Sequence, residues 1–133
     1  MSAKDQPNSP ANRGERIALI EDDDEVRRSL SVLLRANGFA VEAFDNGVEL
    51  LHAANSLDAD CLLVDYKLPR LDGLALLSRL RDEGVSTPAV LITGYFSNSL
   101  DARARAVGYR RVIEKPALAP SLVHGLRDVI ENP

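Results

Sequence analysis

Five side chains that could do chemistry stand at the ends of short apolar runs in this sequence. They are two adjacent carboxylates, a third carboxylate, a hydroxyl and an amine: Glu21, Asp22, Asp65, Thr93 and Lys115. Aspartate is depleted in strands, so Asp65 at the end of its run indicates a strand that delivers a charged group to the edge of a sheet. The chemistry of the set depends on whether one sheet edge gathers all five.

Three carboxylates gathered in this way need a positive charge. At a separation of about 4 Å and an effective dielectric constant of about 20, each pair repels by about 4 kcal/mol. Carboxylate oxygens with room for water suit Mg²⁺, which usually takes one or two carboxylates and fills its remaining positions with water and phosphate oxygens. Lys115 would supply a second positive charge. The residue types therefore predict a magnesium site beside an ammonium group.

Five apolar segments alternate with five segments of helical periodicity. The predicted strands are residues 16–20, 39–44, 61–64, 89–92 and 111–114. The predicted helices run from Val26 to the turn Asn37-Gly38, over 47–54, onward from Asp72-Gly73, over 97–107, and onward from Pro120. Strands that are apolar on both faces and alternate with helices predict a parallel sheet covered by helices on both sides.

The fold class predicted is α/β, a flavodoxin-like, doubly wound, five-stranded parallel sheet in the order 2-1-3-4-5 with five surrounding helices. This order makes the first and third strands neighbours. In a parallel sheet all carboxyl ends lie at one edge, where ligands bind. The five chemically active side chains are therefore expected to converge.

The composition predicts one globular domain. The 133 residues carry a net charge of −4, which gives no overall attraction to nucleic acid, and contain no apolar run long enough to span a membrane. A single cysteine, Cys61, cannot form an internal disulfide, so we expect a reducing compartment, the cytoplasm. The polar residues 1–15 are predicted to be a flexible tail, and residues 16–131 the domain. His52 and His124 lack a second ligand at metal spacing and are expected to be ordinary surface or boundary residues.

The sequence resembles the receiver domain of two-component response regulators from residue 16 to about residue 131. Five separated motifs carry the resemblance: Glu21-Asp22, Leu63-Val64-Asp65 with Leu68-Pro69, Leu71-Asp72-Gly73, Leu91-Ile92-Thr93-Gly94 and Glu114-Lys115-Pro116. The resemblance implies that the protein is a signalling phosphoacceptor, and not an enzyme beyond its own phosphorylation and dephosphorylation. A sensor histidine kinase or a histidine phosphotransfer protein would donate the phosphoryl group.

The resemblance also implies a role for each site residue. Asp65 accepts the phosphoryl group, and Mg²⁺ is held by Asp22, Asp65 and the backbone carbonyl of Lys67, with Glu21 acting partly through a metal-bound water. Thr93 bonds the phosphoryl oxygens after transfer. Lys115 pairs with Asp65 or with the phosphoryl group, and the Lys115-Pro116 peptide bond is cis.

One position departs from the family pattern and affects how a signal would leave the site. Where the family usually has a switching Tyr or Phe, this sequence has Val112. We expect Tyr95 or Tyr109 to take part of that role. The surface formed by the fourth helix, fifth strand and fifth helix would then control a downstream protein or output domain, with a basic docking face presented by Arg103, Arg105, Arg110 and Arg111.

Further expectations concern partners and assembly. We expect no direct nucleic-acid or membrane binding, a monomer or weak dimer, and either a free-standing receiver or one excised from a longer regulator.

Two alternatives to this function remain open. A pseudo-receiver would bind partners without phosphorylation. A haloacid-dehalogenase-like phosphatase would use Asp22-Asp23-Asp24 as its Asp-x-Asp motif, but it would leave Asp65 without a role and lacks acidic ligands after Lys115.

Overall fold

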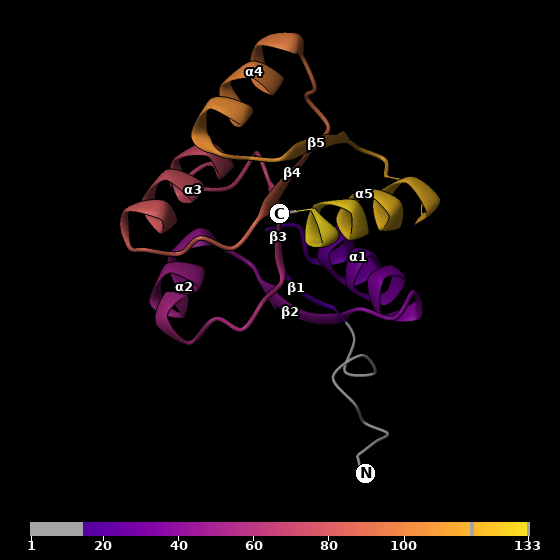
Figure 1. The fold of residues 1–133 in the computed structure, drawn as a ribbon. Coiled ribbons are helices and arrows are strands. Elements are labelled where there is room, and N and C mark those ends of the chain that lie inside the picture. The colour runs from indigo at the N-terminus through magenta and orange to yellow at the C-terminus, as the bar shows by residue number, and fades with distance from the viewer. Residues whose placement is uncertain (1–14, 118, 133) are drawn as a thin grey trace.

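The five predicted strands form one parallel sheet (Figure 1). In this computed structural model, which describes residues 15–117 and 119–132, the strands are β1 (Arg16–Ile20), β2 (Ala40–Phe44), β3 (Cys61–Asp65), β4 (Ala89–Thr93) and β5 (Arg111–Glu114). Their order is β2-β1-β3-β4-β5, and every neighbouring pair is parallel. The predicted fold class and strand order are confirmed. The predicted tail falls, apart from Glu15, on residues that lie outside the described ranges.

Helices cover both faces of this sheet (Figure 1). They are α1 (Asp24–Ala36), α2 (Gly47–His52), α3 (Gly73–Asp82), α4 (Asn98–Val107) and α5 (Ala119–Glu131), with a short 3₁₀ turn, η2, at Ala54–Ser56. The helices α1 and α5 pack on one face, and α2, α3 and α4 pack on the other. Within the described ranges, no helix is long and apolar enough to cross a membrane.

The central strands are buried on both faces, as their continuous apolar runs predicted. Alternate residues of β3 point to opposite layers: Leu62 and Val64 join the cluster under α2, α3 and α4, whereas Cys61 and Leu63 join the cluster under α1 and α5. Cys61 is fully buried, and burial raises the pKa of its thiol to about 12. This two-sided core holds the end of β3 in a fixed position at the centre of the sheet.

Several element boundaries differ by one or two residues from those predicted, and a capping hydrogen bond explains the start of α1. Helix α1 begins at Asp24 and not at Val26, since the Asp23 carboxylate accepts hydrogen bonds from the main-chain N–H groups of Glu25 and Val26. The helix predicted over 47–54 ends at His52, and the chain continues as the 3₁₀ turn η2.

The second strand also starts later than predicted, at Ala40 and not at Phe39. Gly38 adopts a φ of +94°, a left-handed conformation that glycine accepts readily at a helix end. The Phe39 N–H then returns to the Leu34 carbonyl at 3.1 Å, so Phe39 belongs to the helix cap and is buried against α5 instead of entering the sheet.

Candidate functional site

Three carboxylates meet at the carboxyl edge of the sheet. Glu21 and Asp22 directly follow β1, and Asp65 is the last residue of the neighbouring strand β3. Each offers a carboxylate oxygen, and these oxygens lie within 4.8 Å of one another. Glu21 and Asp65 are buried, at 1% and 5% exposure, whereas Asp22 is exposed. The strand order therefore brings together the acidic residues that the sequence singled out.

Lys115 reaches this cluster from the end of β5. Its Nζ lies 2.7 Å from Glu21 Oε1 and 3.3 Å from Asp65 Oδ1. Its main-chain N–H donates to the Thr93 carbonyl at 2.8 Å, which fixes the segment beside β4, and the Lys115-Pro116 peptide bond is cis, as the resemblance implied. In this arrangement the ammonium group pairs more closely with Glu21 than with Asp65.

The electrostatics of the site leave it short of positive charge. Burial, followed by the neighbouring Glu21 carboxylate, raises the pKa of Asp65 to about 7, although Lys115 acts in the opposite direction. Burial disfavours the charged form of Lys115, but its hydrogen bond to Glu21 and the charge of Asp65 outweigh that effect and raise its pKa. One ammonium group therefore faces three carboxylates. The oxygen donors and the charge deficit both fit a divalent cation such as Mg²⁺.

Thr93 lies beside Asp65 at the end of the adjacent strand. The strand register pairs Asp65 with Ile92, the residue before Thr93, and the threonine side chain is fully buried. Its Oγ1 accepts a hydrogen bond from the Tyr95 main-chain N–H at 2.9 Å. Because that bond uses an oxygen lone pair, the hydroxyl proton of Thr93 remains available to an acceptor in the site.

The acceptor loop, defined here as residues 66–73, returns the chain from β3 to α3. Its last residue, Gly73, donates its N–H to the Tyr66 carbonyl at 2.9 Å. A Cβ at Gly73 would lie 2.7 Å from the Asp65 carbonyl oxygen, so only glycine fits at this contact without movement. The Lys67 side chain extends over the exposed Tyr95 ring, with Nζ 5.0 Å from the ring centroid.

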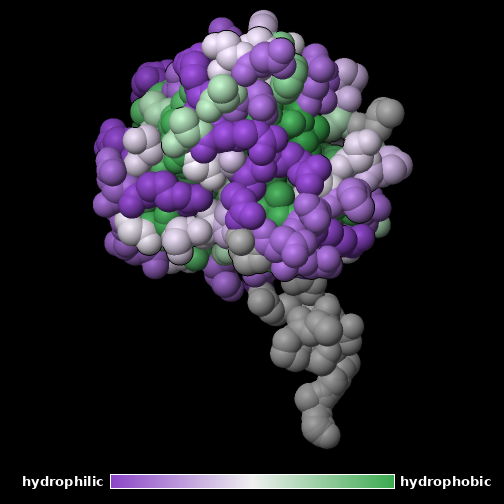
Figure 2. All heavy atoms as spheres, turned by 45° about the horizontal axis from the view of Figure 1, so that its top comes forward, coloured by the Kyte–Doolittle hydropathy of each residue, from purple (hydrophilic) through white to green (hydrophobic). Residues whose placement is uncertain are grey.

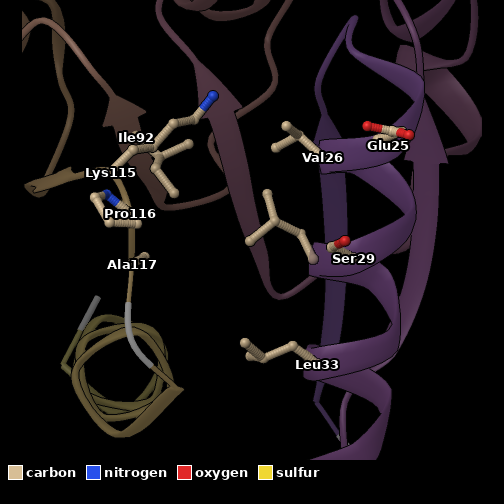
Figure 3. Close-up of a pocket in the computed structure, with 9 residues that line it drawn as sticks. Glu25, Val26, Ser29, Leu33, Ile92, Lys115, Pro116 and Ala117 are labelled. Carbon is tan, nitrogen blue, oxygen red and sulfur yellow. The ribbon is translucent and has the colours of Figure 1, made fainter.

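Sequence reasoning missed two features around the site. The first is a hydrogen bond from the buried Tyr109 hydroxyl to the Gly73 carbonyl, at 2.7 Å, between residues that are 36 positions apart. No local pattern signals such a contact. The second is a groove of about 500 Å³ between α1 and the segment after β5, lined on its apolar sides by Val26, Leu33 and Pro116. Figure 3 shows Lys115 and Ile92 on the strand side of this groove and Glu25 on the α1 side.

The histidines and arginines that the sequence raised lie away from the carboxylates. His52 and His124 are exposed, as expected. Two of the four arginines predicted to form a basic face have acidic partners: Arg105 pairs with Asp101 at 3.1 Å, and Arg111 pairs with Asp128 at 2.6 Å. Figure 2 shows the molecule with α4 turned toward the viewer. The surface on this side mixes hydrophilic residues with small apolar areas. Half of the arginines of the expected basic face are thus paired within the chain, and its role in docking stays a prediction.

Comparisons with known proteins identify the family of this chain. A family model described as the response regulator receiver domain matches residues 17–127. The transcriptional regulatory protein FixJ of Azorhizobium caulinodans is 32% identical over 111 residues, which cover 84% of this chain and 53% of that protein. The response regulator MprA of Mycobacterium avium is 34% identical over 117 residues, which cover 88% and 51%. The chain spans about half the length of these curated relatives.

Solved structures show the same fold. A crystal structure titled FixJ-N superposes with a TM-score of 0.83 at 27% identity, covering 90% of this chain and 95% of that one. Full-length FixJ from B. japonicum gives a TM-score of 0.83 at 31% identity, covering 91% of this chain and 59% of that one. The chemotaxis protein CheY4 of Vibrio cholerae, at 24% identity and a TM-score of 0.82, covering 87% and 98%, supports the fold alone.

A flavodoxin-like α/β domain with an acidic cluster at the carboxyl edge of its sheet is the class that these observations define. The chain belongs to the family of response regulator receiver domains of two-component systems. Members of this family are signalling proteins and not classical enzymes. The haloacid-dehalogenase alternative has no support from the family match.

Proposed function

We propose that Asp65 accepts a phosphoryl group from the phosphohistidine of a sensor histidine kinase or of a histidine phosphotransfer protein. The observation that carries this proposal is the position of Asp65 at the end of the central strand. Glu21 lies beside it, and the Lys115 ammonium group lies 3.3 Å from its carboxylate. Phosphoryl transfer requires mainly such positioning and charge neutralisation. In this reaction an Asp65 oxygen bonds to phosphorus as the P–N bond breaks, and the electron pair of that bond stays on the departing imidazole.

Mg²⁺ would be held by Asp22, Asp65 and the main-chain carbonyl of Lys67, with Glu21 acting through a bound water. When bound, the ion neutralises charge on the carboxylates and on the phosphoryl oxygens. The protein side chains supply the remaining contacts. Thr93 can donate its free hydroxyl proton to a phosphoryl oxygen, and Lys115 can follow the negative charge from the carboxylate to the phosphoryl group.

The groove next to Lys115 offers a route for the donor protein. It is lined by apolar side chains of α1 and by Pro116, and it reaches the lysine that contacts Asp65 (Figure 3). A helix carrying the phosphohistidine could bury an apolar stripe here and present its imidazole to the acceptor.

We further propose that phosphorylation changes the α4, β5 and α5 surface to control a downstream protein or output domain in the cytoplasm, with residues 16–131 as the receiver unit.

The test is covalent labelling. The protein is incubated with acetyl phosphate and Mg²⁺, and its intact mass is measured. We expect one added phosphoryl group on the wild type and on Asp58→Asn, a matched control whose carboxylate is exposed near the opposite edge of the sheet. We expect none on Asp65→Asn. Labelling of Asp65→Asn would refute the assignment, and an unlabelled wild type would favour the pseudo-receiver.

A further inference from the structure

Tyr109 connects the corner between α4 and β5 to the acceptor loop. It is 2% exposed, and its hydroxyl donates to the Gly73 carbonyl at 2.7 Å. Its own main-chain N–H donates to the Ala104 carbonyl in the last turns of α4, so the side chain starts from a fixed backbone. Burial raises the pKa of Tyr109 well above its ordinary value, which keeps the hydroxyl protonated and able to donate.

Gly73 is the point at which the acceptor loop closes on the strand that carries Asp65. Its N–H holds the Tyr66 carbonyl, and its α-carbon packs so closely on the Asp65 carbonyl that a methyl group would not fit. The hydroxyl of Tyr109 holds the same residue through its carbonyl. Gly73 is therefore fixed on one side by the acceptor strand and on the other by Tyr109.

The rest of the acceptor loop is held by the Tyr66 N–H, which donates to the Ile92 carbonyl at 3.0 Å, and by the buried side chain of Leu68. Lys67, Pro69 and Arg70 are exposed, and Arg70 adopts a left-handed φ of 67°. The main-chain hydrogen bonds inside the loop, from Leu68 to Tyr66 and from Leu71 to Pro69, are local and do not tie it to another element. Gly73 holds the carbonyl of Tyr66, the residue before Lys67, so a shift of Gly73 would move the peptide group that leads to Lys67.

We propose that Tyr109 is a positioning residue for the phosphoacceptor site, which holds the acceptor loop in the geometry that Mg²⁺ binding requires. The inference rests on the proposed function, because it uses Lys67 as a metal ligand. Partners that orient a metal ligand typically change affinity by 10- to 100-fold when removed. Tyr109 acts one step further away, through Gly73, so we expect about a 3- to 10-fold loss of Mg²⁺ affinity in Tyr109→Phe.

The substitution Tyr109→Phe removes the hydroxyl and keeps the buried ring. Tyr66→Phe is the matched control, since it removes a hydroxyl from the acceptor loop for which the described residues show no hydrogen bond. Mg²⁺ alone is titrated into each protein and followed by the NMR shifts of the Lys67 and Gly73 amides, and amide hydrogen exchange is measured over residues 66–73. We expect weaker binding and faster exchange at Gly73 in Tyr109→Phe only.

A Tyr109 hydroxyl with a purely structural role would give another pattern. Tyr109→Phe would then lower the unfolding midpoint while the Mg²⁺ affinity stayed within about twofold of the wild type, and that result would overturn the proposal. An equal loss in Tyr66→Phe would overturn it as well. Failure of the proposed function is separable from this outcome, because a wild type that binds Mg²⁺ but gains no phosphoryl group would leave the comparison between Tyr109→Phe and Tyr66→Phe unaffected.

Discussion

Neutralising Asp65 should stabilise the protein when divalent cations are removed. The carboxylate is 5% exposed, and burial together with Glu21 raises its pKa from 3.8 to about 7, against the opposing effect of Lys115. A carboxyl group whose pKa is raised in the native state binds its proton more tightly there than in the unfolded state. Its ionised form therefore destabilises the fold. Asparagine has nearly the same shape without the charge, and Asp65→Asn therefore removes that cost.

The raised pKa sets the size of the effect. A change of one in the pKa corresponds to about 1.36 kcal/mol, so the rise in the pKa of Asp65 from 3.8 to about 7 corresponds to about 4 kcal/mol as an upper bound. Solvent at the sheet edge reduces this figure, and we expect about 2 kcal/mol at pH 8. For a domain of this size, that stabilisation raises the Tm by about 8 °C.

The pH dependence distinguishes this charge effect from a change in packing. Below about pH 4 both states of the wild type hold the proton, so Asp65→Asn has little advantage. Between about pH 4 and pH 7 the wild type loses stability relative to the variant, and above the raised pKa the difference becomes constant. Urea unfolding in EDTA, followed by far-ultraviolet circular dichroism at pH 5 and pH 8, measures both points, with Asp58→Asn as the control. If Asp65→Asn is no more stable than the wild type at pH 8, or if its advantage is equal at pH 5 and pH 8, then the ionised carboxylate does not destabilise the fold as argued.

Three further predictions use other parts of the site. Asp22→Ala should weaken Mg²⁺ binding at least tenfold in an NMR titration, since a tenfold loss is already typical when a residue that only orients a metal ligand is removed. An unchanged titration would move the ligand role to another acidic residue. Gly73→Ala should destabilise the fold by about 1–3 kcal/mol in urea, because its Cβ meets backbone at 2.7 Å, whereas Gly94→Ala faces open space and should be nearly neutral. Lys67→Asn and Tyr95→Ala should each speed the decay of the aspartyl phosphate, because the stacked pair crowds the path of an attacking water; equal or slower decay in both would refute this.

The fold was predictable because its signals are local and repeated. Apolar runs bounded by turn residues identified each strand, and the alternation with helices required a parallel sheet whose carboxyl ends share an edge. That edge alone brings Glu21 next to Asp65, although 44 positions separate them. The boundary errors at Val26 and Phe39 arose from capping hydrogen bonds, which depend on the φ and ψ of single residues and not on hydrophobic period.

Contacts between distant side chains could not be predicted in the same way. The pairing of Arg105 with Asp101 follows from helical spacing, but that of Arg111 with Asp128 depends on how α5 lies against β5. A count of arginines therefore does not show which of them are paired within the chain. The same limit hid the partner of Tyr109, because a tyrosine in a sequence gives no indication of where its hydroxyl will point.

Helix α4 is linked to the acceptor site near both of its ends. At the start, the Thr93 hydroxyl accepts the Tyr95 N–H, two residues before the Ser97 cap of the helix. At the end, Tyr109 holds Gly73 against the backbone of Asp65. Between these links only Leu100 and Ala104 are buried, so little apolar packing resists a shift of the helix. A phosphoryl group that draws the Thr93 hydroxyl toward itself would act on the first link while the second stays fixed. The expected motion is therefore a pivot of α4 about its C-terminal end and not a displacement of the whole helix.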